Sequence, residues 1–197
     1  MITLLYLDES GCCPESPLSY GYGQIGQQKS ISQRTRKGRR VNIMGVWEEK
    51  TRFEYALKVG TYKTKNYLHF MNWQAEKALK RLFETGNLTV IIHDNASIHR
   101  SKIAKKHYQI WEKQGLSVFF LPPYSPEMNR IEEQWRRAYR LRSSSSTTGG
   151  FSNRALKRQE LGGYVFEDEY DLAKAIIKGI ENRGQQGNYA VERLMFN

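Results

Sequence analysis

Two carboxylates stand where the sequence predicts that buried strands end. Asp94 follows the apolar run Val90-Ile91-Ile92 and precedes small polar residues, and Asp8 follows the apolar residues 2–7. Open α/β sheets place their chemistry at the carboxyl ends of such strands. Taken alone, Asp94 and Asn95 more often only start a turn, with Ser97 capping the next helix. The repetition of the pattern at Asp8 favours a site.

A third carboxylate, Glu132, follows a stiff connector. The connector contains three prolines between positions 122 and 126, which fix φ and favour extended conformations in the residues before them. We expect it to deliver a helix that begins near Asn129 at a set angle, with Glu132 at the third helical position. The spacing of Asn129 and Glu132 also suits a capping box, in which the Glu only binds a backbone amide. The apolar face of the helix is expected to hold Ile131, Trp135 and Ala138.

Asp8, Asp94 and Glu132 together suit catalysis of phosphoryl transfer by two divalent metal ions. Ions about 3.5–4 Å apart activate a water molecule and stabilise the leaving 3′ oxygen. Carboxylate ligands suit magnesium, with manganese as an alternative, whereas zinc would call for His or Cys. His93 and His99 are left out of the site, because isolated histidines beside a strand are more often structural or phosphate contacts.

Composition limits the partner and the compartment. The 197 residues suit one domain, or one with a small appendage. A net charge of +11 with a pI near 9.6 indicates nucleic acid or an acidic membrane surface as partner, with a merely solvated basic surface as the alternative. No apolar run reaches the roughly 18 residues of a membrane span, and the first five residues do not resemble a signal peptide. Adjacent Cys12 and Cys13 suit neither a disulfide framework nor a zinc site. We expect a cytoplasmic protein that is associated with the nucleoid when bound to DNA.

The first part of the chain is expected to form antiparallel strands. Residues 20–25 and 41–47 are predicted as strands, and residues 52–59 alternate apolar with polar side chains, as in a strand with one covered face. The connection between the first two is dense in cations, which we interpret as an arm that contacts the DNA backbone, with a merely solvated loop as an equally weighted alternative. Its predicted DNA-binding residues are Lys29, Arg34, Arg36, Lys37, Arg39 and Arg40.

The rest of the chain alternates helices and strands. Helices are predicted over residues 65–84 and 101–114, strands over 89–92 and 116–121, and a closing helix from about Asp168. The pattern predicts an α/β fold with a mixed central sheet, an antiparallel N-terminal hairpin region and flanking helices. We expect three parts: a catalytic core over residues 1–142, a flexible Ser-rich insertion or linker over 143–160, and a C-terminal helix packing on the core over 161–197.

Three ordered motifs resemble the DDE transposases of ribonuclease H-like fold, in the bacterial insertion-sequence branch of the mariner superfamily. The motifs are residues 7–11, 93–99 and 121–135, and thirty-seven residues separate Asp94 from Glu132, close to the spacing in that family. The resemblance covers about residues 1–135 and resumes near residues 161–193. Two departures are Arg130, where the family usually has Pro, and the Ser-rich segment, which interrupts the helix bearing Glu132.

The resemblance implies that Asp8, Asp94 and Glu132 are the metal-binding catalytic triad of a DNA endonuclease and strand transferase. It implies cleavage at the ends of an insertion element and transfer of the 3′-OH into target DNA at TA sites. Expected partners are double-stranded DNA, a second copy in a homodimer or larger complex, and a separately encoded helix-turn-helix part. The alternatives are a ribonuclease H-like nuclease without strand transfer, and an inactive fragment that only binds nucleic acid through residues 29–40.

Overall fold

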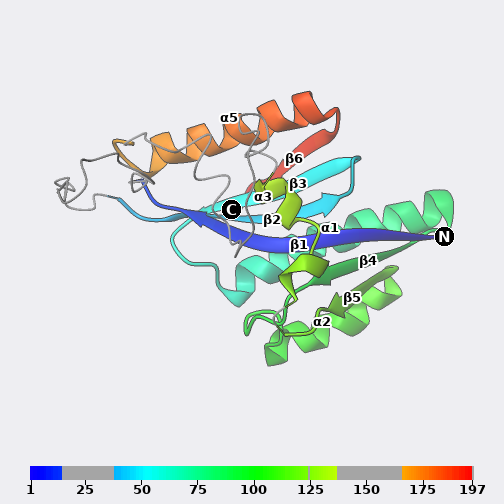
Figure 1. Cartoon of the computed structure of the whole chain (residues 1–197). Coiled ribbons are helices and arrows are strands. Elements are labelled where there is room, and N and C mark those ends of the chain that lie inside the picture. Colours follow the sequence, from blue (N-terminus) through cyan, green and yellow to red (C-terminus); the bar gives the residue numbers. More distant parts are fainter. Residues whose placement is uncertain (15–37, 124, 137–165, 197) are drawn as a thin grey trace.

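A six-stranded sheet with the order β5-β4-β1-β2-β3-β6 forms the centre of the computed structural model (Figure 1). The structure describes residues 1–14, 38–123, 125–136 and 166–196. The predicted strand at residues 20–25 and the Ser-rich segment lie outside these ranges. The strands are β1 (Ile2–Cys12), β2 (Val41–Glu48), β3 (Arg52–Val59), β4 (Leu88–His93), β5 (Leu116–Phe120) and β6 (Ala190–Leu194).

The sheet is mixed, because β1 pairs antiparallel with one neighbour and parallel with the other. On one side β1, β2 and β3 pair antiparallel, and on the other side β4 and β5 continue from β1 in parallel. The β2–β3 connection is tight and includes Lys50, with a positive φ of 59°. This arrangement confirms the predicted mixed sheet with its antiparallel N-terminal hairpin.

Helices cover both faces of the sheet. α1 (Thr64–Thr85) and α2 (Lys102–Lys113) lie on one face, and α3 (Glu132–Arg136) and α5 (Glu169–Gly187) lie on the other, as the two core clusters show (Figure 1). α1 ends where Gly86 adopts a left-handed conformation and its N–H donates to the Leu82 carbonyl, the common way to end a helix. None of the described helices has both the length and the apolar character that a membrane crossing requires.

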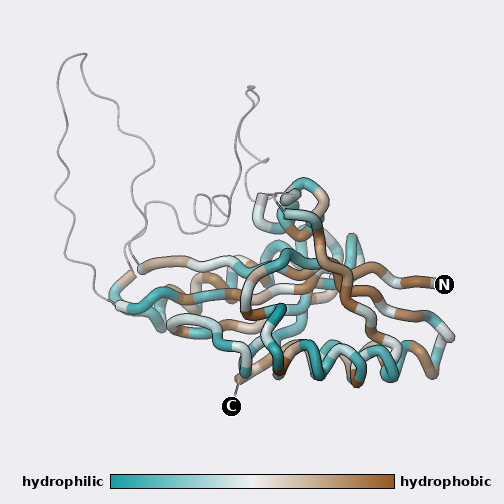
Figure 2. Tube along the Cα trace, turned by 90° about the horizontal axis from the view of Figure 1, so that it is seen from below, coloured by the Kyte–Doolittle hydropathy of each residue, from teal (hydrophilic) through white to brown (hydrophobic). Residues whose placement is uncertain are grey.

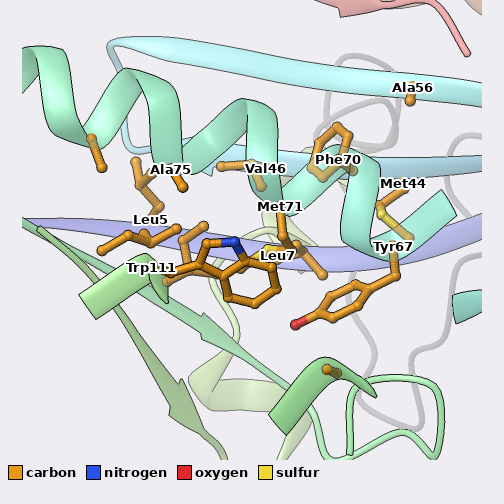
Figure 3. Close-up of a cluster of buried hydrophobic side chains, with 14 of the residues drawn as sticks. Leu5, Leu7, Met44, Val46, Ala56, Tyr67, Phe70, Met71, Ala75 and Trp111 are labelled. Carbon is orange, nitrogen blue, oxygen red and sulfur yellow. The ribbon is translucent and has the colours of Figure 1, made fainter. Parts of the chain in front are cut away.

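Alternate residues of β1 and β2 enter two separate cores, as the period of two in a strand requires. The first core packs α1 and α2 against the sheet, with Trp111 and Tyr67 among its fully buried side chains (Figure 3). The second lies beneath α3 and α5 and includes Trp47, Phe53 and Trp135. Along the helices, hydrophobic and hydrophilic residues alternate as this one-sided burial demands (Figure 2).

Two expectations about the elements were wrong. β1 does not end before Asp8 but continues to Cys12, because these residues pair with β2 from Asp8 opposite Gly45 to Cys12 opposite Val41. β6, for which the sequence offered no prediction, pairs in parallel with β3. α3 begins at Glu132 and not near Asn129, because the Asn129 side chain is used elsewhere: its Nδ2 donates to the Leu7 carbonyl at 2.8 Å. Asn129 Oδ1 accepts no hydrogen bond in the described part of the chain, so the Asn half of the proposed capping box does not form.

Candidate active site

The pairing of β1 with β4 brings two of the predicted acids toward the same end of the sheet. Tyr6 pairs with Ile92 in the parallel register, and Asp8 and Asp94 each lie two residues further along. A step of two residues keeps a side chain on the same face of a strand. Asp8, inside β1 and facing α3, and Asp94, which directly follows β4, therefore lie toward the same end of this parallel strand pair.

α3 is anchored to β1 on both sides of Glu132. Before it, Asn129 donates to the Leu7 carbonyl, and after it, Trp135 Nε1 donates to Asp8 Oδ2 at 3.0 Å. Trp135 is fully buried and meets Phe53 edge-on, with ring centroids 5.7 Å apart. These contacts place Glu132 close enough to Asp8 for its charge to act on that carboxylate.

The surroundings of Asp8 disfavour the charged form of its carboxylate. Burial raises the pKa of Asp8 to about 8, and the negative charges of Glu9 and Glu132 add to the effect, against the opposing hydrogen bond from Trp135. A divalent cation would remove this penalty by neutralising the crowded carboxylates. Oxygen ligands alone, from Asp8, Asp94 and Glu132, also fit the preference of magnesium or manganese.

Asp94 lies in a different environment. Its side chain is 57% exposed, and its Oδ1 accepts from the Ala96 amide at 3.1 Å and faces His99 Nδ1 at 3.1 Å. The hydrogen bond from His99 holds the pKa of Asp94 below its ordinary value, although partial burial opposes this. Asp94 is therefore ionised at neutral pH and ready to bind a cation.

Sequence reasoning missed the role of two histidines. His99 is fully buried, and although burial lowers its pKa, hydrogen bonds to Asp94 and Glu9 outweigh that effect and raise it to about 9. Burial and the charge on His99 lower the pKa of His93 to about 4, so His93 is neutral. The signal available in the sequence was the short spacing of both histidines around Asp94.

The ring nitrogens of these histidines already have partners. Ligand atoms of His93, Asp94 and His99 lie within 4.8 Å of one another, near enough for one metal ion. His93 Nδ1 donates to the Asp94 carbonyl at 2.7 Å, and its Nε2 accepts from the Tyr67 hydroxyl at 3.2 Å. Because both nitrogens of His99 face carboxylates, this trio is a hydrogen-bonded support and not a second metal site.

The predicted DNA-binding arm is described only at its end. Arg39 binds Glu169 through two nitrogens at 3.1 Å, and Arg40 Nη2 donates to the Gly11 carbonyl at 3.4 Å. Both contacts tie the start of β2 to neighbouring elements. The other predicted contacts lie outside the described residues: Lys29, Arg34, Arg36 and Lys37.

Substitution of Gly45 tests how packing around Asp8 supports the candidate site. Gly45 lies opposite Asp8 on β2, and a Cβ there would meet Phe53 at 2.9 Å and Trp135 at 3.3 Å. Gly45→Ala is expected to lower the free energy of unfolding by about 1–3 kcal/mol and to displace the Trp135 indole from Asp8. Urea unfolding followed by tryptophan fluorescence measures both effects. Gly60→Ala is a poor control because Gly60 has a positive φ, so Ala56→Gly, at a buried β3 position, supplies the comparison for a destabilised sheet.

Comparison with known proteins assigns the family. The family model of the DDE superfamily endonucleases matches residues 3–147, whereas no curated protein sequence matches the chain. Among solved structures, the mariner Mos1 paired-end complex with Mg gives a TM-score of 0.62 at 17% identity, covering 92% of this chain and 48% of that one. The Mos1 strand transfer complex gives 0.51 at 18% identity, covering 91% and 52%.

The chain thus spans about half the length of these transposase structures. The structural match confirms the predicted ribonuclease H-like fold, and the family match confirms the resemblance on which the predicted enzyme class depends. The triad motifs through residue 135 all fall within the matched residues. The chain therefore belongs to the DDE superfamily endonucleases.

Proposed function

We propose that the chain is the catalytic domain of an insertion-element transposase, which cleaves DNA at element ends and transfers the strand into target DNA. One observation carries the proposal: Asp8 on β1 and Asp94 after the neighbouring parallel strand β4 lie toward the same end of the strand pair, and α3 brings Glu132 close enough for its charge to act on Asp8. Mos1, whose structures share the fold, has been solved as a strand transfer complex.

Asp8, Asp94 and Glu132 would hold two divalent ions, magnesium or manganese. Mos1 paired-end complexes have been solved with each of these metals. Such ions supply an activated water and stabilise the leaving 3′ oxygen. The protein's own part is to keep the acids in place: Trp135 orients Asp8 through Oδ2, and the anchored α3 carries Glu132 to the same edge of the sheet.

Exposed cations that follow Asp94 in the chain support DNA as the substrate. The segment from the Asp94 loop into α2 presents side chains that form no ion pair with any described residue, and phosphates would satisfy them. They add to the proposed contacts of residues 29–40. A homodimer or larger complex on DNA, and a separate helix-turn-helix part, are further parts of the proposal. The exposed cations are Arg100, Lys102, Lys105 and Lys106.

The third acid is tested by a pair of adjacent glutamates. Glu132→Gln is expected to reduce Mg²⁺-dependent nicking of element-end DNA by about 10²-fold or more, because the charge on the third ligand is lost. Glu133→Gln is the matched control, with the same chemical change one residue further along α3. A labelled element-end duplex is incubated with each variant, and nicked and joined products are separated on a denaturing gel.

The products of the wild-type protein separate the candidate functions. Joined products support transposition, whereas nicking alone supports a ribonuclease H-like nuclease. Salt-sensitive binding without any cleavage would indicate an inactive fragment. If Glu133→Gln abolishes nicking and Glu132→Gln does not, the assignment of the third acid is wrong.

A further inference from the structure

A buried histidine lies between carboxylates from two different strands. His99 Nε2 is 2.9 Å from Glu9 Oε1, and Nδ1 is 3.1 Å from Asp94 Oδ1. An ionised carboxylate oxygen only accepts hydrogen bonds, so each ring nitrogen must donate one. A ring that donates from both nitrogens has no free lone pair for a metal ion. His99 therefore links Glu9 to Asp94.

The position of the ring is fixed from several sides. The Tyr67 ring lies 4.6 Å from the His99 ring, and the His93 ring meets it at 4.4 Å, centroid to centroid. The Tyr108 hydroxyl donates to the His99 carbonyl, which also fixes the backbone. With no exposed side-chain surface, His99 has little freedom to change its rotamer.

This fixed ring holds one oxygen of Asp94. Oδ1 accepts from the Ala96 amide and lies 3.1 Å from His99 Nδ1, which is also 3.3 Å from the Asp94 carbonyl, whereas Oδ2 accepts no hydrogen bond from any described residue. The two donors together restrain rotation of the carboxylate. Oδ2 is thereby left as the oxygen that a cation can bind.

Glu9 supplies the other end of the link. It follows Asp8 in β1, so the two side chains leave opposite faces of the strand. Asp8 turns to the face of α3 and Trp135, and Glu9 reaches His99 on the face of α1 and α2. One strand thus provides a proposed metal ligand and, from the next residue, the support for a second ligand.

We propose that Glu9 and His99 are positioning residues, which act through Asp94 and fix its carboxylate for cation binding. The inference rests on the proposed metal-dependent function and adds two residues to it. The competing interpretation is that His99 is a core histidine whose loss only destabilises the fold. Metal affinity of the folded protein and exchange at Ala96 relative to amides in β4 separate these interpretations, because a global loss of stability does not act on this loop alone.

The first test measures Mn²⁺ binding by electron paramagnetic resonance at a temperature where every variant is folded. His99→Ala is expected to weaken binding by about 10–100-fold, the usual cost of removing a group that orients a metal ligand. Glu9→Gln retains an oxygen that accepts from His99, so we expect a smaller loss, of about 3–10-fold. If His99→Ala does not fold, Glu9→Gln alone decides the test, and unchanged affinity overturns the proposal.

Two control variants show whether a loss of stability, or the replacement of a histidine elsewhere, by itself changes Mn²⁺ affinity. Ile43→Val removes one methylene from the second core, and His69→Gln replaces an exposed histidine on α1. Ile43 packs in the second core and His69 meets the Phe196 ring edge-on, so wild-type affinity is expected for both. Equal weakening in Ile43→Val and His99→Ala would mean that His99 acts through stability alone.

The second test uses the metal-free protein and does not depend on the proposed function. The Ala96 amide donates to Asp94 Oδ1, so release of that carboxylate exposes the amide. His99→Ala is expected to speed hydrogen exchange at Ala96 by about 10-fold or more, relative to amides in β4. Unchanged exchange overturns the positioning role. If exchange rises but wild-type protein binds no Mn²⁺, the positioning stands and the proposed metal-dependent function fails.

Discussion

Asp94→Asn is expected to reduce Mg²⁺-dependent nicking of element-end DNA by roughly 10³-fold or more, while the fold stays intact. The amide oxygen of Asn can still accept from the Ala96 amide and His99, so the loop after β4 keeps its hydrogen bonds. What is lost is the negative charge that a divalent ion requires. Nicking of a labelled duplex and thermal unfolding of the same preparation measure the two effects.

Asp171→Asn is the matched control for this variant. Asp171 is a partly exposed acid on α5 with a Lys174 partner at 3.4 Å, so the same change of charge is made away from the candidate site. We expect near-wild-type nicking from the control. Equal nicking by Asp94→Asn and the wild type would refute the role of Asp94 as a metal ligand.

The place of Asp94 after β4 could be predicted because its signal is local, whereas Asp8 was expected at a strand end and lies within β1. An apolar, largely β-branched run indicates a buried strand, and the acid that follows must lie at its carboxyl end. The structure adds the register, Tyr6 opposite Ile92, which places Asp8 and Asp94 toward the same end of the β1–β4 pair. The turn interpretation of Asp94 was not wrong in its geometry, since Asp94 Oδ1 does accept from the Ala96 amide.

The support for these acids could not be predicted, because it depends on contacts between distant residues. Glu9 and His99 are separated by 90 positions, and their contact requires both the β1–β4 pairing and the correct face of β1. Similarly, Asn129 binds the Leu7 carbonyl 122 positions away. A local capping rule assigned Asn129 to its own helix because the rule contains no information about a distant unpaired carbonyl.

Asp8 and Asp94 differ in how their negative charges affect the stability of the fold. His99 and the Ala96 amide stabilise the charge of Asp94, whereas burial, Glu9 and Glu132 disfavour the charge of Asp8. Because Asp8 lies between the Glu132 helix and the Glu9 link, its charge is the one that a bound cation would relieve most. Removing the Asp8 charge should therefore raise the stability of the metal-free protein and abolish the stabilisation that a bound metal ion provides.

Asp8→Asn is expected to stabilise the metal-free protein, by about 1–3 kcal/mol at pH 8, while it abolishes cleavage. The pKa of Asp8 is raised from 3.8 to about 8, so the native state binds a proton more tightly than the unfolded state. The stability of the wild-type protein is then expected to fall as pH rises from about 4 to 8. An Asn cannot ionise, and its oxygen can still accept from Trp135 Nε1.

Urea unfolding of both proteins between pH 4 and 8.5 measures the difference, with Glu84→Gln, an exposed residue at the end of α1, as control. The advantage of Asp8→Asn should be near zero at pH 4 and largest at pH 8, whereas Glu84→Gln should show no such trend. Added Mg²⁺ is expected to raise the melting temperature of the wild type and not that of Asp8→Asn, because ligand binding stabilises only the state that binds it. An Asp8→Asn protein less stable than the wild type at pH 8 would show that this carboxylate supports the fold instead of opposing it.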